Sequence, residues 1–314
     1  MLRDRLLTSS ILIAAVVVLL WLDARHPLLG IDGLWLVPLL LFFTLGTAFD
    51  LATMLQTSGR AVERRWVIAA AGLVALSPYF PSLWPIMGRQ YPSDCPIGGP
   101  GWLVAGAIMA IFVLLFREII HYRSGSGSLE RTLAGVFASI YVGAPMGLLV
   151  LIRQAGGEPV GKSTLVGATT WGLTALVAVI AVTKSADIGA YFTGKSIGKY
   201  KMIPQLSPGK TWEGAIGGIV MAVLVSYACF FFLLPAISQV RQPPPWWGPI
   251  VFGTVCAVAG MIGDLAESLV KRETGVKDSG TWLPGLGGVW DVTDSLIGAI
   301  MPAWIMLAAG LAGS

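Results

Sequence analysis

Residues 247–263 read Trp-Gly-Pro-Ile-Val-Phe-Gly-Thr-Val-Cys-Ala-Val-Ala-Gly-Met-Ile-Gly, without one charged side chain. A second uncharged, apolar run occupies 295–312, and the stretch between the two runs is polar and rich in glycine. A helix that crosses a membrane needs about 20 mostly apolar residues, and fewer suffice when flanking side chains reach the interface. The pattern therefore predicts two membrane-spanning helices joined by a polar segment at 263–295.

The composition extends this interpretation to the whole chain. Hydrophobic residues make up 55% of the 314 positions and charged residues only 12%, whereas a soluble domain carries about 25% charged residues. We expect an all-α, polytopic integral membrane protein with about nine transmembrane helices. It forms a single membrane domain, 1–314, with N-terminal spans at roughly 1–160 and a catalytic half at roughly 165–314. The expected spans are 5–22, 34–55, 66–80, 101–117, 132–152, 165–183, 214–234, 247–263 and 295–312.

The basic residues predict the orientation. With the N-terminus in the cytoplasm, sixteen of the 21 Lys and Arg fall in inside segments and five outside, as the positive-inside rule requires. Two long polar segments, 184–213 and 263–295, then face the cytosol, and we expect them to form two halves of one site in the cell (inner, cytoplasmic) membrane. No nucleic-acid partner is expected, because the basic residues do not form a run.

One run resembles a nucleotide-binding P-loop in sequence only. The run Gly156-Gly-Glu-Pro-Val-Gly161-Lys162-Ser163 matches the P-loop pattern letter for letter. That motif needs a strand before it and a helix after it to cradle phosphates. Here a membrane helix precedes the run and the topology puts it outside, so we expect it to bind no nucleotide.

The chemistry is expected in the polar segment 263–295. Asp264 ends one apolar run, and Asp291 and Asp294 begin the next. Carboxylates at the depth of a membrane are costly and by default mark a functional site. Asp291 and Asp294 are three residues apart, so a helix that starts there puts both on one face. Acids that converge near bases suit Mg²⁺, which takes carboxylates together with substrate phosphates. For the Lys271-Arg272-Glu273 part, an ordinary cytosolic loop with salt bridges is the alternative.

The other segment repeats the pattern of an acid beside small residues. Asp187 lies at the end of an apolar run, and Ser207, Lys210 and Thr211 follow it with hydroxyl and ammonium groups that can contact phosphate. Ser207-Pro208 is also typical of a helix start, with Glu213 near the positive end of the dipole. Both can hold, since a helix N-terminus is itself an anion site.

At these residues the sequence resembles the phosphatidate cytidylyltransferase family, also called CDP-diacylglycerol synthases. The family signature is Ser-x-x-Lys-Arg, four residues, Lys-Asp-x-Gly, then Leu/Ile-Pro-Gly-His-Gly-Gly and Asp-Arg-x-Asp. The matching residues are Ser268, Lys271, Arg272, Lys277, Asp278, Gly280, Leu283, Pro284, Gly285, Gly287, Gly288, Asp291 and Asp294. Upstream, the family's second block is matched by Asp187, Gly189, Tyr191, Gly194 and the run from Ser207 to Gly214. The chain departs from the signature at two positions, with Leu286 in place of the usual His and Val292 in place of the usual Arg.

The resemblance implies the reaction of CTP with phosphatidate to give CDP-diacylglycerol and pyrophosphate. It implies Mg²⁺ as cofactor, with Asp264 and Asp291 as ligands and Asp294 assisting them or holding a second cation. The implied catalytic residues are Asp264, Lys271, Arg272, Asp291 and Asp294. The implied substrate-binding residues are Asp187, Ser207, Lys210, Thr211, Ser268, Lys277, Asp278, Gly287 and Gly288.

The partners so implied are CTP, a lipid phosphate and the bilayer, and a homodimer is left open. Three alternatives are open as well. A cytidylyltransferase for another lipid phosphate would share every motif. A transporter would distribute its acids along the spans in two similar halves, whereas this chain concentrates them at one end. The third is an inactive paralogue that has lost the His and Arg of the signature.

Overall fold

A computed structural model describes residues 2–92, 95, 97–125, 127–155, 170–238, 244–276 and 278–311. Three sequence predictions fall partly or wholly outside these residues. They concern Lys277, the P-loop-like run at 156–163 and the first residues of the span expected at 165–183.

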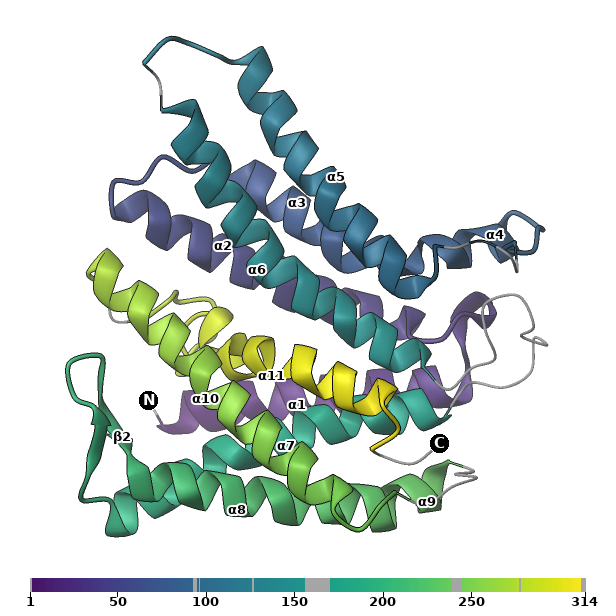
Figure 1. The fold of residues 1–314 in the computed structure, drawn as a ribbon, viewed down its shortest axis with the longest axis vertical. Coiled ribbons are helices and arrows are strands. Elements are labelled where there is room, and N and C mark those ends of the chain that lie inside the picture. The colour runs from purple at the N-terminus through teal and green to yellow at the C-terminus, as the bar shows by residue number, and fades with distance from the viewer. Residues whose placement is uncertain are drawn as a thin grey trace. The chain divides into compact units, whose positions relative to one another are not determined.

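The regular elements of the described chain are helices and one short two-stranded hairpin, joined by loops. Its helices are α1 (Leu2–Arg25), α2 (Val37–Thr57), α3 (Arg64–Leu76), α4 (Leu83–Ile86), α5 (Gly99–Ile120), α6 (Ser128–Gln154), α7 (Thr170–Ile197), α8 (Trp212–Ala228), α9 (Leu234–Ile237), α10 (Gly248–Thr274) and α11 (Trp290–Ala308). The strands β1 (Lys201–Ile203) and β2 (Ser207–Thr211) are antiparallel and connect α7 to α8 (Figure 1).

Nine helical stretches of the described chain are long and apolar enough to cross a membrane. They are Leu6–Arg25, Leu34–Thr57, Arg64–Ile86, Gly99–Ile120, Ser128–Gln154, Thr170–Ile197, Trp212–Ile237, Gly248–Thr274 and Trp290–Ala308. Each overlaps one of the nine spans expected from sequence, so the all-α, polytopic class is confirmed. The protein is a multi-pass membrane protein.

The chain forms two compact units. Within the described residues, the first takes in 2–151 and 273–293, and the second takes in 152–155, 170–272 and 294–311. In the first unit α2 packs on α3, and α3 packs on α5 (Figure 1). The expected division into N-terminal spans and a catalytic half concerns function and stays a prediction.

Small residues let α7 and α8 pack closely in the second unit (Figure 1). A Cβ atom on Gly189 of α7 would lie 2.6 Å from the Cβ atom of Met221, and one on Gly218 of α8 would lie 2.8 Å from the carbonyl oxygen of Ala186. Close backbone approach through glycine is a common way for membrane helices to associate. The hairpin joins the C-terminal end of α7 to the N-terminal end of α8.

The two polar segments are more helical than the sequence indicated. α7 continues to Ile197 and α10 to Thr274, so Asp187 and Asp264 lie within helices and not at helix ends. Lys271 contacts Glu267 across one turn of α10, and pairs at this spacing stabilise a helix beyond its apolar part.

The helix start proposed at Ser207-Pro208 is wrong. These residues open β2, and α8 begins at Trp212. Thr211 is the N-cap, and its hydroxyl accepts a hydrogen bond from the backbone N–H of Gly214 at 3.1 Å. A threonine in extended conformation is a preferred cap, which explains why the helix begins after the hairpin.

Candidate active site

Two helices of the second unit cross at glycine residues. A Cβ atom on Gly298 of α11 would lie 3.0 Å from the Cα atom of Gly263 on α10, and one on Gly263 would meet the carbonyl oxygen of Asp294. Any larger side chain would push the two backbones apart. The crossing therefore sets the residues that follow Gly263 opposite Asp294.

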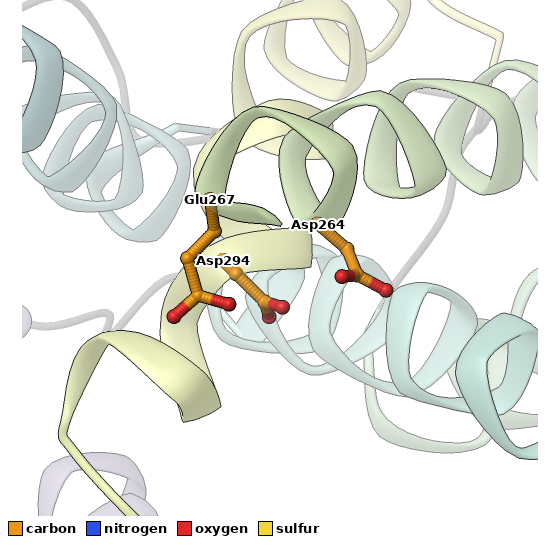
Figure 2. Close-up of side chains that lie close together, drawn as sticks. All are labelled: Asp264, Glu267 and Asp294. Carbon is orange, nitrogen blue, oxygen red and sulfur yellow. The ribbon is translucent and has the colours of Figure 1, made fainter. Parts of the chain in front are cut away.

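Three carboxylates gather at this crossing (Figure 2). Asp264 and Glu267 lie one turn apart on α10, and Asp294 points toward them from α11. One oxygen of each acid lies within 4.8 Å of an oxygen of each of the other two. Glu267 and Asp294 are only 3% and 8% exposed, and Asp264 is partly exposed. We call these three residues the acid cluster.

The acid cluster is electrostatically strained on its own. Two unit charges about 4.8 Å apart repel each other by about 3 kcal/mol at an effective dielectric constant of about 20. Burial adds the cost of removing each carboxylate from water. Positive charge close by stabilises the ionised form of the three acids.

Two lysines supply part of that charge. Lys210, on β2, places its Nζ 2.8 Å from Oδ2 of Asp264. Lys271, on α10, places its Nζ 2.9 Å from Oε2 of Glu267. Both ammonium groups belong to largely buried side chains, 19% and 14% exposed, where charge pairs are screened little by salt.

A third lysine lies in a network next to Asp294. Lys184 of α7 donates to the Oγ of Ser295 at 2.8 Å and to Oδ2 of Asp187 at 3.3 Å. The Ser295 hydroxyl in turn donates to Asp187 at 2.8 Å. The backbone N–H of Ser295 donates to Oδ1 of Asp294 at 2.6 Å. This network holds Ser295, the residue after Asp294, against α7.

The hairpin is held on α10 at two points. Lys210 contacts the acid cluster, and its Nζ also donates to the carbonyl oxygen of Met261 at 3.3 Å. Arg272 donates from Nε to the carbonyl oxygen of Leu206 at 3.2 Å. Arg272 as a whole is exposed. Parts of the two polar segments thus lie in contact in the second unit; that the segments form two halves of one site stays a prediction.

The acid cluster fits a divalent cation. Its three donors are carboxylate oxygens, which are hard ligands, and Mg²⁺ is bound in proteins through such oxygens together with phosphate oxygens of the substrate. Two of the three carboxylates are buried. A cation among them would offset the repulsion between the carboxylates, which the two lysines balance only in part. The residues present are therefore suited to Mg²⁺.

Asp291 has a different environment. It belongs to the first unit, where its Oδ2 accepts hydrogen bonds from the backbone N–H of Gly288 at 2.6 Å and from the Ser279 hydroxyl at 2.8 Å. The carboxylate thereby closes the loop before α11. Its expected part in metal binding stays a prediction.

The loop closed by Asp291 needs its glycines. Gly287 has φ of 99°, a conformation that side chains other than glycine rarely adopt. A Cβ atom on Gly288 would lie 2.6 Å from the backbone nitrogen of Gly280. Leu286 lies in the turn, and its backbone N–H donates to the carbonyl oxygen of Leu283 at 2.9 Å. Asp278 is exposed at the start of this loop.

The sequence interpretation missed three residues of the second-unit site. Glu267 was not assigned to the metal, although it lies three residues after Asp264 and therefore on the same helix face. Lys184 and Ser295 were taken as helix boundaries, and only the fold shows that they share a network with Asp187. Ser268, an expected substrate ligand, is half-buried on α10.

A model described as the cytidylyltransferase family matches residues 3–309 of the chain. The phosphatidate cytidylyltransferase of Brucella suis biovar 1 (strain 1330) is 38% identical over 199 residues, which are 63% of this chain and 61% of that protein. That of Bacillus subtilis (strain 168) is 42% identical over 139 residues, 44% of this chain and 49% of that protein. That of Pseudomonas aeruginosa (strain PAO1) is 38% identical over 168 residues, 52% and 57% respectively. The matched part thus spans about three fifths or less of the length of these curated relatives. The family match covers nearly the entire chain, and the protein belongs to the cytidylyltransferase family.

Proposed function

We propose that the protein is a phosphatidate cytidylyltransferase, which converts CTP and phosphatidate to CDP-diacylglycerol and pyrophosphate. The observation that carries the proposal is the acid cluster of Asp264, Glu267 and Asp294, paired with Lys210 and Lys271. A site of this charge pattern suits a triphosphate and its cation. The names of the relatives supply the substrate class.

The reaction needs no histidine base. A phosphate monoester has a second pKa of about 6, so the lipid phosphate is largely a dianion at neutral pH. One of its oxygens attacks the α-phosphorus of CTP, the bond from that phosphorus to the bridging oxygen breaks, and pyrophosphate leaves with the electron pair. The protein's task is to place two anions together and to offset their charge, as in other phosphoryl transfers.

The residues divide this task. Asp264, Glu267 and Asp294 would hold Mg²⁺, which when bound neutralises charge on the triphosphate and the leaving pyrophosphate. Lys210 and Lys271 exchange an acid partner for phosphate oxygens as substrate binds, and Arg272 adds a planar group able to make two parallel bonds to phosphate. Asp291, Asp278, Gly287 and Gly288 enter through the signature resemblance alone.

An apolar groove supports a lipid substrate. It has a volume of about 450 Å³ and lies between α7 and α8, lined mostly by apolar side chains such as Phe192, Ile216, Val220 and Leu224. Its polar end is at Glu213, in the first turn of α8. An acyl chain in the groove with its headgroup at Glu213 would leave that headgroup near the end of α7 and the start of α8.

The orientation is part of the proposal. The sixteen-to-five distribution of Lys and Arg supports a cytoplasmic N-terminus and a cytosolic active site in the cell membrane. CTP would then reach the acid cluster from the cytosol, while the acyl chains of the substrate and product stay in the bilayer.

The test is a reconstituted assay. Purified protein in detergent with Mg²⁺, labelled CTP and phosphatidate should release pyrophosphate and form a labelled lipid, and chelation of Mg²⁺ should stop both. A parallel arm supplies a polyprenyl phosphate in place of phosphatidate. Product from the polyprenyl phosphate alone would replace phosphatidate as the substrate. No product from either lipid would contradict the proposal and favour an inactive paralogue or a transporter.

A further inference from the structure

A buried acid of the first unit contacts the loop 279–288, which carries part of the family signature. Asp50 lies on α2 and is 1% exposed. Its Oδ2 accepts hydrogen bonds from the backbone N–H groups of Val289 at 2.7 Å and Trp290 at 3.1 Å. These donors are at the start of α11, where a helix has no acceptors of its own for its first N–H groups. A carboxylate from another helix thus caps α11.

The loop fits around Asp50 so closely that only glycine has room. A Cβ atom on Gly280 would lie 2.5 Å from Oδ1 of Asp50, and one on Gly288 would lie 2.5 Å from its Oδ2. The same face of α2 contacts Val289 through Gly46, where a Cβ atom would lie 2.7 Å from Cγ2 of Val289. The two signature glycines are therefore packed against one side chain.

Asp50 and Asp291 hold adjacent parts of the same backbone. Asp50 accepts hydrogen bonds from the N–H groups of Val289 and Trp290. Asp291 accepts one from the N–H of Gly288, the residue immediately before them. A shift of the backbone at Val289 would move Gly288 and the first turn of α11 together. The direction of the Asp291 carboxylate thus depends on the bonds that Asp50 makes.

We infer that Asp50 is a positioning residue, which fixes the loop 279–288 and the first turn of α11 so that Asp291 and the signature glycines meet the substrates. A charged group is well suited to this work, because a charge-assisted bond to backbone N–H groups is about twice as strong as a neutral one. The catalytic half of the inference rests on the proposed function. The structural half does not.

Hydrogen–deuterium exchange tests the structural half directly. In Asp50→Asn, which keeps the size of the side chain and removes its charge, amides in peptides covering 279–290 should exchange at least about 5-fold faster than in the wild type, because the bonds that protect them are weakened. Gly280→Ala presses on the same carboxylate from the loop side and should act in the same direction. If Asp50→Asn does not fold, exchange in Gly280→Ala alone tests the structural half of the inference.

Thr44→Val is the matched control. Thr44 is a buried residue of α2, and its hydroxyl donates to the carbonyl oxygen of Leu40 in the same helix at 2.7 Å. The variant removes a hydrogen bond made within α2 and leaves those from α2 to the loop and to α11 in place. Its exchange at 279–290 should stay within about 2-fold of the wild type. Unchanged exchange in both Asp50→Asn and Gly280→Ala would overturn the inference, whatever the activity.

The Mg²⁺ dependence of product formation tests the catalytic half. Asp50→Asn should raise the Mg²⁺ concentration for half-maximal rate at least about 3-fold, whereas Thr44→Val should leave it unchanged. Faster exchange without any change in rate or Mg²⁺ dependence would make Asp50 a structural cap only and overturn its role in positioning. A wild type inactive on every lipid phosphate would remove the proposed function and this half with it, while the exchange result would still decide the contact.

Discussion

Glu267 is the most buried residue of the acid cluster. It is 3% exposed, lies one turn from Asp264 and contacts Lys271 at 2.9 Å. Glu267→Gln keeps the shape, removes one donor charge and leaves Lys271 without this acid partner. Removing even an outer-shell partner of a metal typically costs about 10–100-fold in affinity or activity.

We therefore expect Glu267→Gln to lower kcat/KM by at least about 100-fold and to raise the Mg²⁺ concentration for half-maximal rate. Initial rates across a Mg²⁺ titration measure both. Glu130→Gln is the control, because Glu130 is an exposed acid in the first turn of α6. A Glu267→Gln protein with the Mg²⁺ dependence of the wild type would show that Glu267 is not a ligand.

Leu286 and Val292 are the residues at which this protein departs from the family signature. Each replaces a group able to bond a phosphate, and such a charge-assisted bond is worth about 2–3 kcal/mol. All the carboxylates of the signature are retained, so we expect Leu286→His to act mainly on substrate affinity, by up to about 100-fold, and to change the rate at saturating substrate only modestly. Steady-state rates across a CTP titration check this. An inactive wild type that gains activity from Leu286→His and Val292→Arg together would instead identify a degenerate paralogue.

At the scale of elements, the crossing of α10 and α11 is the feature that builds the site. Gly298→Ala would put a methyl group 3.0 Å from the Cα atom of Gly263, so the helices must separate. Overpacking of this kind costs about 1–3 kcal/mol, and it would also pull Asp294 away from Asp264. We expect a lower thermal midpoint and at least about a 10-fold loss of activity, since small misplacements of reacting groups are costly.

Gly310→Ala is a comparison variant for that experiment, because no atom lies within 4 Å of a Cβ atom placed there, although its φ of 79° strains any side chain. It should lower the thermal midpoint without lowering the rate per folded molecule. Equal losses of rate in the two variants would mean that the crossing itself does not set the geometry of the acids.

The elements could be predicted from the sequence where apolar length decides them. The nine candidate spans of the described residues were all found, because runs such as 247–263 have no other explanation in a chain so poor in charge. The continuation of α10 beyond Asp264 was not found, because its last two turns are polar and are stabilised by the pair Glu267–Lys271. The hairpin was missed as well, since Ser207-Pro208 also begins many helices.

The sequence indicated which acids belong to the site better than it indicated which of them lie together. Asp264 and Asp294 stood out as carboxylates beside apolar runs, and the structure brings them together with Glu267. Asp50 carries the same signal, since it lies inside the expected span 34–55, but the sequence does not indicate which residues it contacts. Its bonds to Val289 and Trp290 join residues 239 and 240 positions apart. Only the fold reveals contacts of that separation.

At the scale of the whole molecule, the orientation can be tested by thiol labelling. Cys229 and Cys256 are buried, so a Cys95→Ser background leaves few reactive thiols. Met87, which is 70% exposed, lies in an expected outside segment, and Ser196, which is exposed at the end of α7, lies in an expected inside segment. An impermeant maleimide should label Met87→Cys in right-side-out vesicles and Ser196→Cys in inverted vesicles. The opposite result would reverse the topology and place the acid cluster outside.

The central claim is that the acid cluster holds the cation for transfer of CMP from CTP to a lipid phosphate. Its most direct test is product formation from labelled CTP and phosphatidate by Asp264→Asn across a Mg²⁺ titration, beside the wild type and Glu130→Gln. Asp264 is the acid that pairs with Lys210 at 2.8 Å, so its neutralisation should perturb cation and phosphate binding together. We predict Mg²⁺-dependent product from the wild type and from Glu130→Gln, and none above background from Asp264→Asn at any Mg²⁺ concentration. An Asp264→Asn protein that works at the full rate with unaltered Mg²⁺ dependence would contradict the claim.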